Sequence, residues 1–231
     1  MSTSIRPRDA ASLILLKPDG RDGVVLMGRR PAASTFIPDA FVFPGGRLDP
    51  PDRQIRSPFP LAHETLSAMR GAVSGQDTLS QSLAHTAIRE TYEETGLILG
   101  REARFSAPAH ETWGQLADRG LAPDSSGLRL LARAITPAIS PVRYHARFFV
   151  AQGERAIGTA ASSDELLDLA WYPIADALKL PIIDVTEIVL KHAREVLHSG
   201  ELERGKQPTT TTFVRYRGEH RMVTRESASE P

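Results

Sequence analysis

The chain has 231 residues, of which 41% are hydrophobic and 24% charged, as is typical of a globular protein long enough to bury a large core. Its 28 basic residues balance its 28 acidic residues, so it lacks the basic excess of a general nucleic-acid binder, and without cysteine it has no disulfide, thiolate nucleophile or cysteine zinc site. No apolar run approaches the roughly 18 residues of a transmembrane helix and no secretory core follows the N-terminus, so we expect a cytoplasmic protein that binds neither nucleic acid nor membrane.

Two apolar runs near the N-terminus predict a hairpin. After a loose leader over residues 1–9, residues 10–16 and 24–28 form β-like runs, and the Lys-Pro-Asp-Gly sequence between them predicts a turn. Arg29 and Arg30 follow the second run. Two interpretations of this arginine pair are open: contact with the phosphate or base of a substrate, or a solvated strand end.

A third short strand runs into a bare turn. Phe41–Phe43 is followed by Pro44-Gly45-Gly46, where the two glycines leave the backbone open to the approach of an ion or a phosphate. Residues 53–77 then form an insertion with a short helix at 63–70. A lid, a dimer contact and a passive surface loop are all open interpretations of this insertion.

Three carboxylates stand at the end of a predicted central helix. This helix spans residues 78–95, opens with a capping-box pattern and is followed by Gly96, a suitable residue for a helix C-terminus. Glu90, Glu93 and Glu94 share an arc of about 100° on it, where they repel one another and oppose the helix dipole. Local rules broken three times in one turn indicate a site, although a solvated acidic face is the simpler alternative.

Downstream, the pattern predicts one more helix and two strands before the last third of the chain. The helix covers residues 109–119, and the strands cover 128–135 and 144–151. Arg143 and Arg147 are four positions apart, so the two-residue period of a strand places them on one face. We expect them to form an anion-facing pair.

The last third combines a strand, a helix and a terminal hairpin. The strand covers residues 169–172, and the helix covers 184–198 and opens with a second capping-box pattern. Residues 209–216 and 221–224 predict the hairpin. It lies in a C-terminal extension, residues 201–231, that we expect to end in a disordered tail.

The sequence around the three acids resembles the box of the Nudix hydrolases, G-x5-E-x7-R-E-U-x-E-E-x-G-U, in which U is aliphatic. Its second half is matched by Arg89, the three acids, Gly96 and Leu97, with a threonine at the first aliphatic position. The box glycine and arginine are normally 14 positions apart, but Gly46 and Arg89 are 43 apart, so 29 residues are inserted. Counted back from Arg89, Gln81 replaces the first box glutamate. Such an interrupted box resembles the branch that includes peroxisomal coenzyme A diphosphatases and their bacterial relatives.

The resemblance implies the Nudix fold and its chemistry. The fold is an α+β, α/β/α sandwich with a mixed central sheet between helices, here over residues 8–200. The chemistry is hydrolysis, dependent on Mg²⁺ or Mn²⁺, of the diphosphate linkage in a nucleoside diphosphate derivative that is coenzyme A-like, ADP-ribose-like or a dinucleotide. Family members are often homodimers.

The resemblance also implies roles for the residues that match. Glu90 and Glu94, helped by the Gly45 carbonyl, would hold the metal ions. Glu93 would be either a third ligand or the base for the attacking water, and Arg89 would fix a carboxylate by a bidentate pair. Within the polar loop 162–165, Glu165 is the candidate for an extra ligand or base, with Glu154 in reserve.

Two other functions are compatible with the sequence. The incomplete first half of the box fits a catalytically silent Nudix-fold module that binds a nucleotide and regulates. The acidic helix alone fits an interaction protein that docks a basic partner. Dependence of activity on metal separates an enzyme from both, and sensitivity to salt without a need for metal identifies the docking protein.

Overall fold

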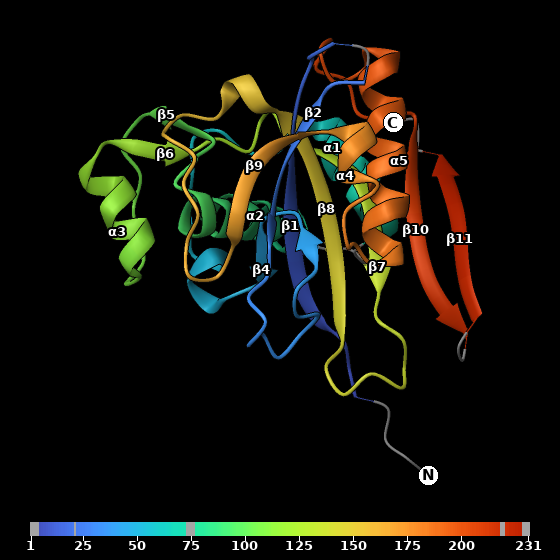
Figure 1. Ribbon diagram of the computed structural model, residues 1–231. Helices are drawn as coiled ribbons and strands as arrows, with labels where there is room; N and C mark the ends of the chain where they lie inside the picture. The colour runs from blue at the N-terminus through green and yellow to red at the C-terminus, as the bar shows by residue number, and fades with distance from the viewer. Residues whose placement is uncertain (1–4, 21, 73–76, 218–219, 228–231) are drawn as a thin grey trace.

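The computed structural model describes residues 5–20, 22–72, 77–217 and 220–227, which form a mixed sheet with helices on both faces (Figure 1). Within these residues nine strands join in the order β11-β10-β7-β8-β1-β2-β3, with β4 paired to β1 and β9 paired to β2. The strands of this sheet are β1 (Arg8–Lys17), β2 (Val24–Arg29), β3 (Phe41–Val42), β4 (Gly45–Arg47), β7 (Arg129–Ile135), β8 (Tyr144–Gln152), β9 (Leu167–Pro173), β10 (Thr210–Arg217) and β11 (His220–Ser227).

Strand β1 is the centre of the sheet and positions the bare turn. It runs parallel to β8 along nearly its whole length. On its other side it pairs antiparallel with β2 at Leu16 and Lys17, which confirms the predicted hairpin, and antiparallel with β4 at residues 10–12. Pro44 joins this arrangement because its carbonyl accepts the Leu13 N–H at 2.9 Å. The glycine pair is therefore fixed against the middle of the sheet.

Two groups of helices cover the two faces of the sheet (Figure 1). One apolar core contains residues of α1 (His63–Ala72), α2 (Asp77–Thr95) and α3 (Glu111–Asp118), with α3 beside the small hairpin of β5 (Gly100–Glu102) and β6 (Leu121–Pro123). The other core contains residues of α4 (Ile174–Ala177) and α5 (Asp184–Ser199). Single helical turns, η1 (Pro50–Arg53) and η2 (Gly153–Arg155), complete the helices. The predicted sandwich of helices, mixed sheet and helices is confirmed.

The insertion between the bare turn and α2 is part of the protein core. Its helix α1 is confirmed, and Ile55, Leu61 and Met69 are almost fully buried in the cluster that α2 also joins. The Thr65 hydroxyl donates to the Leu128 carbonyl at 3.0 Å and ties α1 to the start of β7. In its described part the insertion is therefore neither a lid nor a passive surface loop. A dimer contact stays a prediction, and residues 73–76 lie outside the described residues.

The two predicted helix starts are wrong in detail, although both helices are confirmed. Helix α2 begins at Asp77, and the Gln81 side chain caps nothing: it accepts the Leu61 N–H at 2.8 Å and donates to Ser125 at 3.0 Å. Helix α5 has Ile183 at its N-cap, without a side-chain cap. The ends follow expectation, because Gly96 and Gly200 adopt left-handed conformations with φ of 74° and 67°.

The C-terminal hairpin extends the main sheet. Strands β10 and β11 pair antiparallel as predicted, and β10 also pairs parallel with β7 through residues 212–214. Figure 1 shows the hairpin at the edge of the sheet, beside α5. The predicted leader over residues 1–9 is wrong at its end, because β1 begins at Arg8 and pairs there with β8. Residues 1–4 of the leader and 228–231 of the tail lie outside the described residues.

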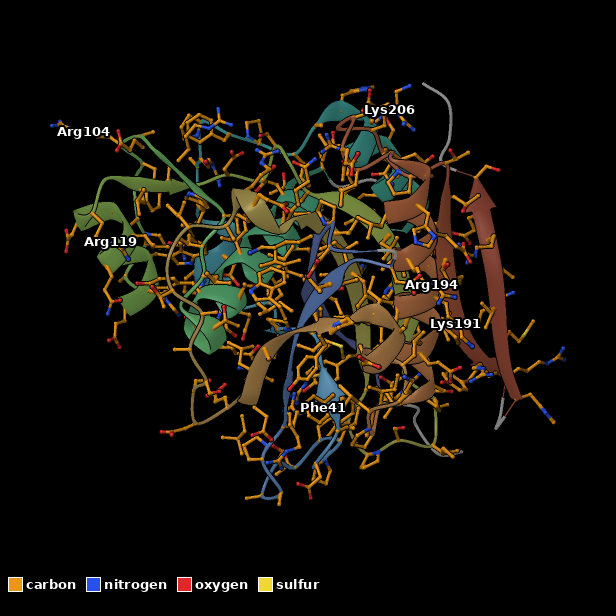
Figure 2. All side chains as sticks on the ribbon, turned by 45° about the horizontal axis from the view of Figure 1, so that its top comes forward. Phe41, Arg104, Arg119, Lys191, Arg194 and Lys206 are labelled. Atoms are coloured by element: carbon orange, nitrogen blue, oxygen red, sulfur yellow. The ribbon has the colours of Figure 1, made fainter. Side chains whose placement is uncertain are left out.

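The outer surface of the molecule carries scattered positive charge. Figure 2 shows the labelled cationic side chains near α3, on α5 and after α5, namely Arg104, Arg119, Lys191, Arg194 and Lys206. No helix in the described part of the chain combines the length and apolar character needed to cross a membrane.

Candidate active site

The bare turn and the acidic helix meet, although they are far apart in the sequence. The Gly45 N–H donates to Glu94 Oε2 at 2.9 Å, across 49 positions of the chain. A Cβ atom at Gly46 would lie 2.5 Å from the carboxylate oxygens of Glu90, so only glycine lets this carboxylate lie against the backbone. The predicted contribution of the Gly45 carbonyl to metal binding stays a prediction, because the contact with Glu94 is made by the Gly45 amide.

Burial raises the pKa values of Glu90 and Glu94. The Glu94 residue is 6% exposed and the Glu90 side chain 14% exposed. Burial raises the pKa of Glu90 to about 7 against the opposing pull of Arg89, and the charge of Glu93 adds to the rise. Burial likewise raises the pKa of Glu94 to about 8, with repulsion from Glu90 as a smaller contribution. The repulsion expected from the sequence is present, but burial is the larger cause.

Glu93 points to different partners. Its carboxylate accepts a hydrogen bond from Arg89 Nη1 at 2.8 Å and another from the Thr112 hydroxyl on α3 at 2.5 Å. On an ideal helix Glu90 and Glu94 are only about 40° apart, whereas Glu93 is about 100° from Glu94. Glu93 therefore points in a different direction from Glu90 and Glu94 and meets different partners. Among the described residues, no three or more His, Asp or Glu side chains are gathered so as to hold a metal ion.

Arg89 holds a carboxylate that the sequence reasoning missed. The guanidinium is 3% exposed and binds Asp52 through two hydrogen bonds of 2.9 Å, one from Nε and one from Nη2. It also lies 2.9 Å from Glu90 Oε1. The expected bidentate pair therefore exists, but its partner comes from the turn after β4 rather than from the helix acids. Arg89 links this turn to both Glu90 and Glu93.

Asp52 is completely buried and fully hydrogen-bonded. Besides Arg89, it accepts hydrogen bonds from the Trp113 indole at 3.1 Å, the Thr86 hydroxyl at 2.9 Å and the Asp49 N–H at 3.1 Å. Burial acts to raise its pKa, but the hydrogen bonds and charge of Arg89 outweigh burial and hold this pKa below its ordinary value. Asp52 is therefore a buried anion.

A signal for Asp52 was present in the sequence. Counted forward from Gly46, Asp52 stands six positions later, where the Nudix box has its first glutamate. Counting back from Arg89 leads instead to Gln81, which bonds to the insertion and to Ser125. The inserted residues lie between Asp52 and Arg89, so only the forward count finds the acid.

A cavity of about 540 Å³ opens beside the turn and the helix. Glu90, Glu94, Gly45 and Gly46 line it, while Glu93 does not. Glu165 also lines the cavity and its charge reaches Glu94, whereas the reserve candidate Glu154 lies on η2, away from the lining.

The four arginines predicted to bind substrate lie in different surroundings. Arg30 lines the cavity, and its positive charge opposes the rise in the pKa of Glu94. Its Nε is buried without a hydrogen-bond partner among the described residues. Arg29 instead forms ion pairs with Asp39 at 3.0 Å and Asp168 at 2.7 Å, neither of which lines the cavity.

Arg143 and Arg147 do not meet as an anion-facing pair. Arg143 donates to the carbonyls of Ile5 and Thr136, and Arg147 is buried against Asp9 at 2.6 Å. Neither arginine lines the cavity. Arg143 precedes β8, so the strand period does not apply to it, and the partners of the two arginines are the protein's own backbone and Asp9.

Residues 6–192 match the model of the NUDIX domain family. The chain belongs to the Nudix family. As a Nudix hydrolase it is a pyrophosphohydrolase, and its class acts on nucleoside diphosphate derivatives. Comparison with curated proteins gives no match.

The chain shares its fold with one solved structure and aligns less well with two others. The Nudix hydrolase from Alicyclobacillus acidocaldarius aligns with a TM-score of 0.64 at 29% identity, over 82% of this chain and 91% of that one. The NUDIX domain of Shewanella oneidensis NrtR, complexed with ADP ribose, aligns at 0.46 and 15% identity, over 84% and 90%. An Ap4A hydrolase from C. elegans aligns at 0.43 and 14% identity, over 82% and 98%.

The Nudix assignment confirms the predicted family, fold and enzyme class. Membership of the coenzyme A diphosphatase branch stays a prediction. The main reason for considering a catalytically silent Nudix-fold module was the missing first acid of the box, and Asp52 supplies an acid at that position in contact with the box arginine.

Proposed function

We propose that this Nudix hydrolase cleaves the diphosphate linkage of a nucleoside diphosphate derivative in a reaction that requires Mg²⁺ or Mn²⁺. The observation that carries the proposal is the meeting of the bare turn with Glu90 and Glu94 at the wall of a cavity. Coenzyme A-like, ADP-ribose-like and dinucleotide substrates all contain this linkage. A homodimer and a cytoplasmic location stay predictions.

The donor set fits a hard divalent cation. Glu90 and Glu94 line the cavity, and their pKa values are raised by burial, so a cation there would relieve an unfavourable pair of charges. The carboxylate of Glu90 occupies the space that a Cβ at Gly46 would fill. One or two carboxylates suit Mg²⁺, which keeps several waters and completes its shell with substrate phosphates. We therefore assign the metal to Glu90 and Glu94, with Glu165 as an additional donor or base.

Bound metal supplies charge neutralisation and an activated water at the diphosphate. The remaining tasks fall to the chain. Arg30, with a buried and unpartnered Nε beside Glu94, binds a phosphate oxygen. Arg89 fixes Glu90 by charge, and its own place is set by Asp52.

Glu93 is a positioning residue in this proposal. Its carboxylate is already occupied by two donors, Arg89 and Thr112, which lowers its value as a proton acceptor. Glu165 lines the cavity and has no such hydrogen-bond donors among the described residues, so it is the better candidate for the base.

The test measures hydrolysis of ADP-ribose, NADH, coenzyme A and diadenosine polyphosphates with Mg²⁺ and Mn²⁺, with products identified by mass. Wild type should cleave at least one of them only when metal is present. Glu94→Gln should lower kcat by about 100-fold or more, because charge stabilisation by the metal is worth several kcal/mol. Glu102→Gln, an exposed substitution on β5, is the matched control and should leave kcat unchanged. Metal-independent cleavage, or full activity of Glu94→Gln, would contradict the proposal.

A further inference from the structure

The cavity extends along neighbouring strands of the sheet, from the acids to the C-terminal hairpin. Ser12 on β1, Phe148 on β8, Ala134 on β7 and Tyr216 on β10 all line it, and these strands are consecutive neighbours. Neighbouring strands lie about 4.8 Å apart, so three steps place β10 about 14 Å from β1. Gly45, which meets the acids, pairs with Ser12 at the β1 end. A diphosphate bound at the acids is too short to reach β10, so Tyr216 faces another part of the substrate.

The β10 end of the cavity has the chemistry of an uncharged ligand. Its walls include the apolar side chains of Ile135, Ile183 and Val185 and the ring of Tyr216. The two arginines among the described lining residues, Arg30 and Arg47, belong to the acid end, because Arg47 lies on β4 and Arg30 reaches Glu94. No described Lys or Arg lines the β10 end. A phosphate there would find no cation in the lining.

Asp184 and Tyr216 form a fixed wall at this end. The Tyr216 hydroxyl donates to Asp184 Oδ2 at 2.8 Å, and Arg221 on β11 donates to the same oxygen at 3.1 Å. The Val185 N–H occupies the other oxygen at 2.7 Å. Because these donors occupy both of its oxygens, the Asp184 carboxylate holds the tyrosine in place rather than binding ligand itself.

The hairpin that supplies this wall lies beyond the family match. Residues 6–192 match the NUDIX domain, whereas β10 begins at Thr210. Parallel pairing of β10 with β7 and the Tyr216–Asp184 hydrogen bond attach the hairpin to the cavity. A segment outside the shared domain is well placed to set what this chain accepts.

We propose that Tyr216, held by Asp184, is a specificity-determining residue that contacts an uncharged arm of the diphosphate substrate at the β10 end of the cavity. The proposal rests on the proposed function, because that function fixes the diphosphate at the acid end. The arm is an aromatic base with its ribose or an uncharged chain of similar length. Its contact with the ring contributes to binding and leaves the chemistry at the acids unchanged.

The experiment uses ligands that a diphosphatase cannot hydrolyse. AMP and 4′-phosphopantetheine each carry one phosphate and one uncharged arm, and inorganic phosphate is the probe without an arm. Calorimetry with Mg²⁺ present should show at least one armed probe binding wild type about tenfold or more tightly than phosphate. Tyr216→Ala should weaken that probe about fivefold or more, the lower bound for losing one aromatic contact, and leave phosphate binding unchanged.

Two further variants separate contact from folding. Tyr216→Leu keeps apolar packing but loses the ring, so it should also weaken the armed probe while its melting temperature stays near that of wild type. Met222→Ala, on the paired strand and 39% exposed, is the matched control and should bind normally. If AMP is the armed probe that binds, adenosine 3′,5′-bisphosphate, which adds a phosphate to the arm, should bind less tightly than AMP.

Each outcome decides one of the two proposals. If neither armed probe binds wild type better than phosphate, if both Tyr216 variants bind within twofold of wild type, or if the added phosphate tightens binding, the inference about Tyr216 is wrong. If the armed probes bind in a Tyr216-dependent way but no diphosphate is cleaved with Mg²⁺ or Mn²⁺, the inference stands and the proposed function fails.

Discussion

Replacing Asp52 with alanine tests whether the site depends on its buried ion pair. The substitution removes the acceptor of five hydrogen bonds, two of them from Arg89, and leaves a guanidinium that is only 3% exposed without its bidentate partner. Breaking a buried pair on one side costs about 3–5 kcal/mol, since the remaining charge stays desolvated. For a chain of this size that corresponds to a fall in Tm of about 6–20 °C.

Guanidinium chloride denaturation and calorimetry at pH 7 measure the effect. Asp52→Asn keeps the shape and part of the hydrogen bonding, so it should fall between wild type and Asp52→Ala. Glu187→Gln removes an exposed ion pair with Lys191 and should cost under about 0.5 kcal/mol. If Asp52→Ala lost less than about 1 kcal/mol more than Glu187→Gln, the pair would not hold Arg89 in place.

The pH dependence of the same comparison has a definite sign. The pKa of Asp52 is lowered in the folded protein, because the charge of Arg89 and the hydrogen bonds from Arg89, Asp49 and Thr86 together outweigh burial. Its stabilisation is therefore fully present above the ordinary pKa of 3.8 and is lost as pH falls through the lower, folded value. The stability difference between wild type and Asp52→Ala should shrink only below about pH 4.

The remaining predictions concern the acids and the turn. Gly46→Ala should lower kcat/KM by about 100-fold or more, because the added Cβ would displace the Glu90 carboxylate and with it the charge stabilisation by the metal. Gly114→Ala, where a Cβ meets open space, is the control and should leave kcat/KM unchanged. Equal activities of the two variants would refute the close fit of Glu90 against Gly46. Burial raises the folded pKa values of Glu90 and Glu94 to about 7 and 8, so the metal-free protein should lose stability as pH rises through these values. A series of melting temperatures that shows no such loss would contradict the claim that burial raises the two pKa values. Protons compete with metal at the same groups, so Mn²⁺ affinity by calorimetry should fall about tenfold per pH unit below pH 7 for each proton displaced. Glu93→Gln should reduce kcat less than Glu94→Gln in a steady-state assay, and the reverse order would restore Glu93 as the base or ligand.

What the sequence could predict here was local. The helix period placed three acids in one turn, and the residue pattern of that turn led to the family. The same period could not say that Glu93 turns to Thr112, because Thr112 arrives on another helix. Nor could it find Asp52, whose pairing with Arg89 crosses the inserted residues.

The arginines show the same limit. The strand period paired Arg143 with Arg147, but β8 begins at Tyr144, and the partners of both arginines come from distant segments that supply Asp9 and the Ile5 carbonyl. Arg29 and Arg30 looked equivalent in sequence. Arg29 is the last residue of β2 and Arg30 follows it, and only Arg30 reaches the cavity.

The 37 positions between Asp52 and Arg89 should make an organised cavity a late product of folding. Helix α2 can form from its own residues, whereas closing a loop of this length costs entropy before the contact rewards it. Until the loop closes, the guanidinium lacks Asp52, the bidentate partner that sets its place. The order of events is thus built into the chain: the core around α1 and α2 must gather first, and only a nearly complete molecule can present its acids to a metal.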